Sequence, residues 1–165
     1  MRNFTADSGI ESIDATGATG PVRLLGDCRA NILDFSATTL SGNIAIDGGG
    51  GNDTITGSAG NDVIEGGRGN QAINGGTGDD IIHAGNGNDT VGGGDGNDIF
   101  RVTGTRWSGF EGWDSYDGGA GNDTIAAYGG RVDIGLTGFS AVNGIEAIDA
   151  TGATGPLRIL GDASA

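Results

Sequence analysis

A nine-residue glycine-rich repeat constrains this chain more than any other feature of its sequence. From residue 48 it reads GGGGNDTIT, GSAGNDVIE, GGRGNQAIN, GGTGDDIIH, AGNGNDTVG and GGDGNDIFR without insertion, and a seventh unit, GGAGNDTIA, occupies residues 118–126. Each unit is a polar turn of six residues, followed two places later by one large apolar residue: Ile55, Ile64, Ile73, Ile82, Val91, Phe100 and Ile125. One inward-pointing side chain per nine residues predicts very short strands separated by tight turns.

A second, longer repeat has a period of 135 residues. Residues 9–27 read GIESIDATGATGPVRLLGD and residues 144–162 read GIEAIDATGATGPLRILGD, so that 16 of 19 positions are identical. We interpret the chain as one full unit of a tandem array together with the start of the next. The partial second copy is expected to act as a cap, because a bare terminal rung of a solenoid exposes core and unpaired backbone.

The flanking segments also have the pattern of short strands bounded by glycine, aspartate and asparagine turns. The predicted strands are Ile10–Ile13, Val22–Leu25, Ile32–Phe35, Ile44–Ile46, Val132–Ile134 and Leu157–Leu160. No segment shows a sustained helical period, so the predicted fold class is all-β, a right-handed parallel β-roll or β-solenoid. We expect irregular rungs over 1–47, the six-repeat roll over 48–101, an aromatic interruption with the seventh repeat over 102–126, and rungs with the partial copy over 127–165.

Composition narrows the classes of partner. The chain has 37 glycines but two prolines, which argues against collagen, and a formal net charge of −14. Nucleic acid and anionic membrane surfaces are poor partners for such a chain, because both select clusters of Lys and Arg. Most of the acids are aspartates, which are short ligands suited to tight turns. This bias favours a hard divalent cation such as calcium.

The repeat supplies what a calcium ion needs. Calcium takes about six to eight oxygen ligands and accepts both carboxylates and backbone carbonyls. Glycine allows a positive φ, so that carbonyl groups can turn inward. Two repeats make a coil of 18 residues, so that turns two repeats apart stack on the same edge. Because stacked rungs lie roughly 4.8 Å apart, one ion fits between two successive turns.

This register assigns the aspartates at position six to two edges. Asp53, Gln71 and Asp89 line the first edge, and Asp62, Asp80 and Asp98 line the second. The first edge is interrupted, because Gln71 is neutral and Arg68 lies in the same turn, so we predict weaker or partly empty sites there. Asp123 serves the seventh turn, and Asp47 and Asp117 are secondary candidates. The candidate glycines at positions two and four are Gly49, Gly51, Gly60, Gly67, Gly69, Gly76, Gly78, Gly85, Gly87, Gly94 and Gly96.

The nonapeptide fits the pattern GGxGxDxUx, where U is a large apolar residue, and it resembles the hemolysin-type calcium-binding (RTX) repeat family over residues 48–101 and 118–126. The resemblance implies several Ca²⁺ ions held between stacked turns. The number of turns suggests four to seven ions. Repulsion between stacked carboxylates further predicts that the chain is disordered without calcium and folds when calcium is added.

Other residues have simpler interpretations. His83 follows the apolar position of its repeat, so we expect it to point outward, and no Ser/His/Asp set can be assembled around this single histidine with confidence. Cys28 is expected to be a small buried residue. The aromatic cluster of Trp107, Phe110, Trp113 and Tyr116 is expected to form a wider local core or loop cover, the alternative being a patch that binds carbohydrate or a partner.

The function predicted from these features is structural and not enzymatic. We expect a calcium-dependent extender module of a large extracellular or cell-surface bacterial protein, of adhesin or surface-layer type, that is secreted and folds outside the cell. Type I secretion is implied by the resemblance. The alternatives are a module that associates head to tail with neighbouring copies into filaments, a non-catalytic part of a polysaccharide-active enzyme, and an ice-binding module. The third repeat positions disfavour ice binding, since only Thr77 among them is a threonine.

Overall fold

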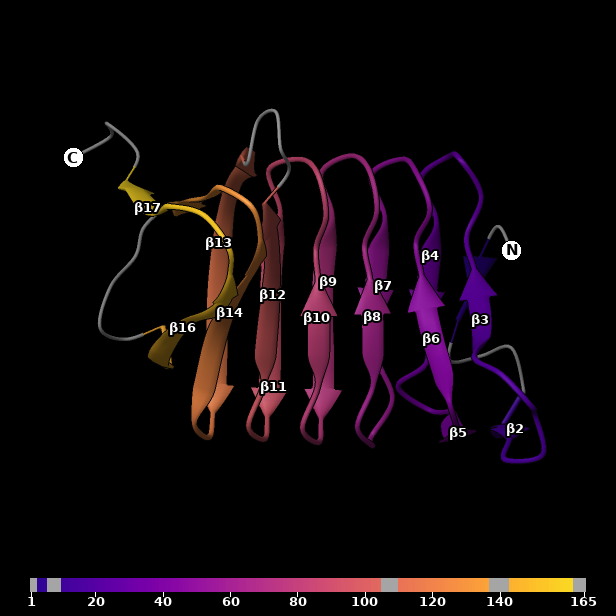
Figure 1. Cartoon of the computed structure of the whole chain (residues 1–165). Helices are drawn as coiled ribbons and strands as arrows, with labels where there is room; N and C mark the ends of the chain where they lie inside the picture. The colour runs from indigo at the N-terminus through magenta and orange to yellow at the C-terminus, as the bar shows by residue number, and fades with distance from the viewer. Residues whose placement is uncertain (1–2, 6–9, 105–109, 137–142, 162–165) are drawn as a thin grey trace.

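The computed structural model describes residues 3–5, 10–104, 110–136 and 143–161, with the backbone alone for Phe110 and Glu111. All regular structure in these ranges is β-strand, and no described helix is long and apolar enough to cross a membrane. Figure 1 shows the strands side by side as successive rungs, in chain order from the N-terminal end to the C-terminal end. The predicted all-β parallel solenoid is therefore confirmed.

Two long parallel sheets form the walls of the solenoid. In spatial order the 8-stranded sheet contains β1 (Asn3–Phe4), β4 (Ile32–Asp34), β7 (Thr54–Thr56), β9 (Ala72–Thr77), β11 (Thr90–Asp95), β13 (Phe110–Ala120), β15 (Val132–Leu136) and β17 (Leu157–Gly161). The 7-stranded sheet contains β16 (Ile145–Ala153), β14 (Asp123–Gly129), β12 (Ile99–Gly104), β10 (Ile81–His83), β8 (Val63–Glu65), β6 (Ile44–Asp47) and β3 (Val22–Leu25). A 2-stranded sheet pairs β2 (Ser12–Ala15) with β5 (Thr39–Gly42).

The register separates narrow rungs from wide ones. Across the uninterrupted repeats each residue pairs with the residue 18 places on, as Thr54 does with Ala72. At the N-terminal end the offset is larger, with Ile32 opposite Thr54, and β5 adds a third side to the rung. The N-terminal rungs are thus wider than those of the uninterrupted repeats, and β2 begins at Ser12 rather than at the predicted Ile10.

The predicted interruption after residue 101 is smaller than expected. Thr90 pairs with Ser115, 25 residues away and seven more than a regular rung. Residues 110–117, FEGWDSYD, therefore occupy the place of a further repeat, with Tyr116 at the apolar position and 4% exposed. Its glycine pattern is degenerate, which is why the regular nonapeptide pattern does not reveal this repeat.

The core is a single column of side chains between the two sheets. All seven predicted apolar residues are buried, none more than 4% exposed. Phe4 stacks on Phe35 at the N-terminal end, with ring centroids 4.5 Å apart, and Phe100 meets Tyr116 at 5.3 Å. Each half-rung contributes only about one such side chain to the core. The conformation of the backbone turns therefore also determines the fold.

The turns require glycine at two positions of the repeat. Gly85 and Gly87 have φ values of +102° and +145°, a region that side chains with a Cβ disfavour. Rungs also approach closely there, and a Cβ on Gly85 would clash with the carbonyl oxygen of Gly67 one rung below. Gly92 in the same repeat differs, because a Cβ built on it has only the carbonyl oxygen of Ile73 within reach, at 3.9 Å.

We predict that Gly85→Ala lowers the free energy of unfolding in calcium by more than about 1–2 kcal/mol, because strain at positive φ adds to the backbone clash. The matched variant Gly92→Ala should be neutral or slightly stabilising, since it only restricts the unfolded chain. Denaturant unfolding followed by circular dichroism measures both. Equal losses in the two variants would contradict the role assigned to the turn glycines.

Candidate metal-binding turns

The acidic side chains at position six stack into a ladder along the second edge. The amide of Asp62 donates to Oδ1 of Asp80 at 2.8 Å, and the amide of Asp80 donates to Oδ1 of Asp98 at 2.9 Å. The series continues from Asp98 to Oδ1 of Asp123 at 2.8 Å and from Asp123 to Oε2 of Glu146 at 2.6 Å. Each turn is therefore fixed to the next through a carboxylate oxygen.

The first edge carries the same ladder with amides in place of some acids. Asn31 donates its amide to Oδ1 of Asp53 at 2.8 Å, and the amide of Asp53 donates to Oε1 of Gln71 at 2.7 Å. Gln71 in turn donates to Oδ1 of Asp89 at 2.7 Å, and Asp89 donates to Oδ1 of Asp114 at 3.0 Å. Along each of the two edges, the position-six residues therefore stack in the order that the nine-residue register predicts.

The ladder uses only one oxygen of each carboxylate. The other oxygen, Oδ2, is buried and accepts no hydrogen bond in four of the turns: Asp53, Asp80, Asp98 and Asp123. A buried anionic oxygen without a partner is costly unless a cation or a donor reaches it. These four oxygens therefore mark positions where positive charge is required.

Each of these oxygens lies so close to the first glycine of its turn that a Cβ would not fit there. A Cβ built on Gly48, the first glycine of its turn, would lie 2.8 Å from Oδ2 of Asp53 and 2.5 Å from the carbonyl oxygen of Gly66 in the next rung. A carboxylate oxygen and a carbonyl oxygen thus converge on one glycine. The same convergence occurs at Gly75, Gly93 and Gly118.

Burial without a partner shifts the titration of these acids. Desolvation raises the pKa of Asp80 to about 7, with further contributions from the neighbouring carboxylates of Asp62 and Asp98. Burial likewise raises the pKa of Asp53, Asp62, Asp98 and Asp123. In the absence of a cation the turns thus favour the protonated acids.

The donor set fits calcium. No three Asp, Glu, His or Cys side chains within the described ranges gather closely enough to hold a metal by themselves, so backbone carbonyls have to complete any ligand set. A set of carboxylate and carbonyl oxygens suits calcium, whereas transition metals select imidazole and thiolate ligands. The buried carboxylate oxygens and the carbonyl oxygens near them therefore fit Ca²⁺ bound between successive turns.

The turn at residues 57–65 differs from the others. Ser58 replaces the second glycine, and its amide donates to Oδ2 of Asp62 at 2.5 Å while its hydroxyl contacts Oδ1 at 3.2 Å. Gly60 accordingly lacks the positive φ found at the corresponding glycines. The sequence predicts a complete second edge, but Ser58 already satisfies the carboxylate at its first turn. Gly60 therefore stays a candidate from sequence only, in a turn of different conformation.

The turn at residues 66–74 carries an amide where its neighbours carry acids. Because Oε1 of Gln71 accepts the amide of Asp53, its amino group Nε2 is buried and has no acceptor. The amino group of Gln71 carries partial positive charge, so it repels a cation bound at this place. The predicted weakness of the sites beside Gln71 therefore depends on this orientation of its side-chain amide.

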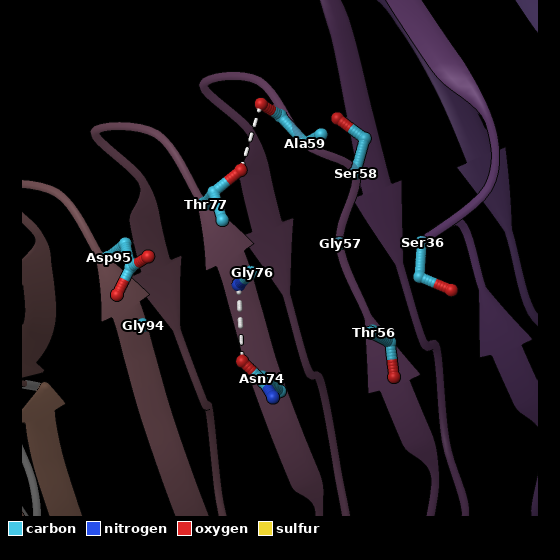
Figure 2. Close-up of a pocket in the computed structure, with 10 residues that line it drawn as sticks. All are labelled: Ser36, Thr56, Gly57, Ser58, Ala59, Asn74, Gly76, Thr77, Gly94 and Asp95. Carbon is cyan, nitrogen blue, oxygen red and sulfur yellow. Dashed lines mark hydrogen bonds between the residues drawn. The ribbon is translucent and has the colours of Figure 1, made fainter.

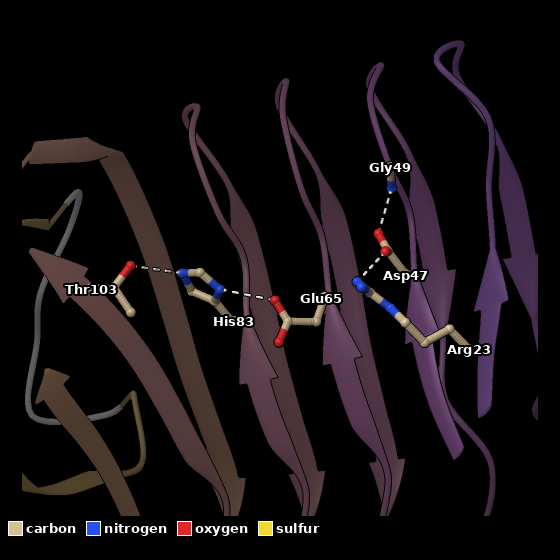
Figure 3. Close-up of polar contacts among 6 residues, drawn as sticks. All are labelled: Arg23, Asp47, Gly49, Glu65, His83 and Thr103. Atoms are coloured by element: carbon tan, nitrogen blue, oxygen red, sulfur yellow. Dashed lines mark hydrogen bonds and ion pairs between the residues drawn. The ribbon is translucent and has the colours of Figure 1, made fainter. Parts of the chain in front are cut away.

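The two secondary candidates lie outside the ladders. Asp47 forms an ion pair with Arg23, and its Oδ1 accepts the amide of Gly49 at 2.9 Å (Figure 3). Asp117 is exposed and directly follows the buried Tyr116 in β13. Their role as ligands stays a prediction, with Asp47 already partly neutralised by an arginine.

Three ladder members were missed by sequence reasoning. Asn31, Asp114 and Glu146 occupy position six of degenerate repeats, and the rungs that contain Asp114 and Glu146 have offsets of 25 and 23 residues. The signal for Asp114 was available, because GxxGxDxU is kept in residues 109–116. Asp114 also accepts a hydrogen bond at Oδ2 from the hydroxyl of Tyr116, at 3.1 Å.

A second ladder runs outside the first and in the opposite direction. On the first edge the amide of Asn70 donates to Oδ1 of Asn52 at 2.9 Å, and the amide of Asn88 donates to Oδ1 of Asn70 at 2.9 Å. Trp113 continues the series to Asn88 at 3.0 Å. Position five thus ties each turn to the preceding rung, whereas position six ties it to the following rung. The Asn-Asp pair that recurs at positions five and six therefore links each turn to both of its neighbouring rungs.

His83 lies on the outer face of the 7-stranded sheet, as predicted. Figure 3 shows its ring between two neighbours, with Nδ1 3.1 Å from Oε2 of Glu65 and Nε2 3.3 Å from Oγ1 of Thr103. The repeat pattern does not predict this line of carboxylate, imidazole and hydroxyl. It crosses parallel strands β8, β10 and β12, and its geometry is that of cross-strand pairing on a half-exposed sheet face.

A shallow groove of about 400 Å³ lies over the other sheet (Figure 2). Gly57, Gly76 and Gly94 contribute to its lining. Thr77 donates from its hydroxyl to the carbonyl of Ala59 at 3.0 Å at the rim. The groove is lined by Ser36, Thr56, Gly57, Ser58, Ala59, Asn74, Gly76, Thr77, Gly94 and Asp95. Its polar groups are hydroxyls and amides with a single carboxylate.

Two smaller predictions have mixed outcomes. Cys28 is exposed, not buried as expected, because it occupies the outward tip of the degenerate turn that contains Asn31. Tyr116 joins the core, in agreement with a wider local core. Trp107 and the side chain of Phe110 lie outside the described residues, so the aromatic patch stays a prediction.

Proton uptake should stabilise the chelated chain. Because the folded pKa of Asp80 is raised from 3.8 to about 7, its contribution is fully present below the unfolded pKa and is lost as the pH rises through 7. We therefore expect more folded chain in chelator at about pH 5 than at about pH 8, and tighter calcium binding at the higher pH. Circular dichroism across this range measures both. Asp80→Asn should flatten the dependence in chelator, and an unchanged slope would contradict it.

Comparison with known proteins agrees with this geometry. The family model described as the RTX calcium-binding nonapeptide repeat (4 copies) matches residues 45–70, 66–100 and 108–131. The third match includes the degenerate turn of Asp114, which the structure places in the ladder. No curated protein and no solved structure showed a significant match to the chain. The repeat region of this chain belongs to the family of RTX calcium-binding nonapeptide repeats.

Proposed function

We propose that this chain is a structural module that folds when calcium binds its stacked turns and that extends a large extracellular bacterial protein. The observation that carries the proposal is the set of buried Oδ2 atoms at Asp53, Asp80, Asp98 and Asp123, each facing a carbonyl oxygen of the next rung. These oxygens are held in place by the rungs themselves. Calcium would join adjacent rungs and so stiffen the solenoid along its axis.

The calcium ions would neutralise charge that the fold concentrates. The chain has a formal net charge of −14, and the ladders bring its aspartates to neighbouring turns. Without a cation, burial and this repulsion both oppose the stacking of ionised carboxylates, and both raise the pKa of Asp80. With several ions bound, the same ladders hold the rungs together. The number of turns suggests four to seven ions, and the four turns with an unpartnered Oδ2 are the first candidates.

The cellular role follows from the same switch. A chain that folds only with calcium can stay unfolded in the calcium-poor cytoplasm, pass through a type I secretion system and fold outside the cell. An adhesin or surface-layer protein would use such modules as spacers. The role assigned to the chain is non-catalytic, and the RTX repeat is itself a calcium-binding structural repeat. Association of the modules head to tail is a second candidate function, favoured by the near-repetition of residues 9–27 in residues 144–162.

We expect a calcium titration to convert a disordered far-UV circular dichroism spectrum into a β spectrum, with no comparable change in magnesium. Magnesium is the control because it demands compact octahedral coordination and gives up its water reluctantly. A chain that is already folded in excess chelator at about pH 8, where the turn acids should be least protonated, would contradict the proposed switch. The turns would then be permanent structural sites.

Gln71→Asp should add a calcium site to the first edge, because it replaces the buried amino group with a second oxygen. We expect about one further bound ion, or a several-fold gain in affinity, by isothermal titration calorimetry. Asn70→Asp is the matched control, because it adds the same charge one residue away on the exposed outer ladder. A similar gain in both variants would show that net charge, and not the ladder position, sets the binding.

A further inference from the structure

The turns of the solenoid differ in where the backbone amide at position two points. In the turn of Asp80, the amide of Gly76 donates backwards to Oδ1 of Asn74 at 3.1 Å. The amide of Gly49 likewise donates to Oδ1 of Asp47 at 2.9 Å. Both acceptors precede the turn in the chain, so the carboxylate at position six receives no donor from position two of its own turn. We call such turns open.

Two turns have the opposite arrangement, and we call them closed. The amide of Ser58 donates forwards to Oδ2 of Asp62 at 2.5 Å, and the amide of Asp27 donates forwards to Oδ1 of Asn31 at 2.9 Å. In each turn the residue two places further on donates its own amide back to the side chain at position two. The side chain at position six thus has a donor within its own turn.

The residue at position two separates the two classes. Short polar side chains such as those of Ser58 and Asp27 bind nearby backbone amides, and neither residue has a positive φ. Glycine permits the positive φ of the open turns. Every described turn with glycine at position two has a positive φ there: Gly49, Gly67, Gly76, Gly85, Gly94 and Gly119.

The N-terminal turns leave little negative charge without a partner. Position six in the turns of residues 26–74 is, in order, Asn31, Asp53, Asp62 and Gln71. Two of these are amides, and Asp62 lies in a closed turn. Asp53 is therefore the one residue of this segment with a buried carboxylate oxygen that accepts no hydrogen bond. Its ladder neighbours on both sides are the uncharged Asn31 and Gln71.

Residues 75–129 have the opposite balance. Asp80, Asp98 and Asp123 stand on three successive rungs of the second edge, and the Oδ2 of each is buried without a partner. Ionised carboxylates one rung apart repel each other, and no amide separates these three. The stacking of these rungs therefore depends on cations far more than the stacking of residues 26–74 does.

The N-terminal rungs also bury more apolar surface. Between residues 32 and 53 four large apolar side chains are buried: Leu33, Phe35, Ile44 and Ile46. The regular rung of residues 72–89 buries two, Ile73 and Ile82. Since apolar burial is the main favourable contribution to folding, the wider rungs have the better balance without a metal ion.

We propose that residues 10–74 form a seed that folds without calcium, and that calcium then adds the rungs of residues 75–161 to it. The inference rests on the proposed function, because it assumes that calcium binds the open turns. The seed is well under half of the 165 residues, so most of the β structure still appears only with calcium. Each added repeat gains an interface with a rung that is already formed, which removes the cost of starting the stack anew.

Hydrogen exchange of the full-length chain, followed by mass spectrometry, tests the seed. In chelator at about pH 8 we expect the amides of β4, β6 and β7 to exchange about tenfold more slowly than those of β10, β12 and β14. In calcium all six strands should be protected. Trp107 and Trp113 both lie outside the seed, so tryptophan fluorescence should report only the calcium-dependent part.

Ser58→Gly should open its turn, because glycine permits a positive φ and lacks the hydroxyl that accepts the amide of Gly60. We expect the protection in chelator to fall about tenfold, and about one further calcium ion to bind in titration calorimetry. Ala59→Gly is the matched control, because it adds a glycine to the same turn and leaves the bonds of Ser58 to Asp62 in place. Equal losses in the two variants would overturn the role of the closed turn.

A second variant extends the seed instead of weakening it. Asp80→Asn places an amide in the first open turn after the seed, as Asn31 and Gln71 do within it, so protection in chelator should reach β10 and about one bound ion should be lost. Absence of any protected strand in chelator, with full protection in calcium, would overturn the seed and leave the proposed function standing. Protection of every strand in chelator would instead contradict the proposed calcium switch itself.

Discussion

The hydrogen bond from the amide at position six to the carboxylate one rung further on is the interaction on which the rest of this structure depends. It fixes Oδ1 of Asp80 and Asp98 and leaves Oδ2 buried beside the first glycine of the turn. One contact thereby sets the register of the rungs and creates an unneutralised charge within them. The fold and the need for a cation have the same origin, so neither can be removed without the other.

This dependence follows from how little core each repeat supplies. Burying one large apolar side chain contributes about 1.5–3 kcal/mol, whereas ordering a single backbone residue costs about 1–2 kcal/mol. A repeat of nine residues with one buried isoleucine, such as Ile82, cannot form a stable rung from its core alone. The cross-rung ladders at positions five and six and the cation between turns have to supply the difference. Glycine at the positive-φ positions makes this harder, because it leaves the unfolded chain the most freedom.

Much of this could be predicted from the sequence because the repeat has a fixed length. A period of nine and two sheets determine an 18-residue coil, and this alone assigned Asp53 and Asp62 to different edges. The same reasoning did not identify ladder residues in rungs that are longer than 18 residues. Asp114 and Glu146 lie one rung beyond insertions, so that a fixed period does not reach them. The turn of Asp62 departs from the expected edge for another reason, because the amide and hydroxyl of Ser58 satisfy Asp62 locally and the pattern of acids does not reveal this.

The tandem rung shows what a repeat sequence has to satisfy on both sides. In one place Arg158 contacts Asp133 of the preceding rung, and in the other Arg23 contacts Asp47 of the following rung. The arginine thus meets an aspartate of an adjacent rung in both settings, although β17 belongs to the 8-stranded sheet and β3 to the 7-stranded sheet. What the two copies share is therefore the ion pair between rungs, and this pair does not depend on which sheet the strand joins.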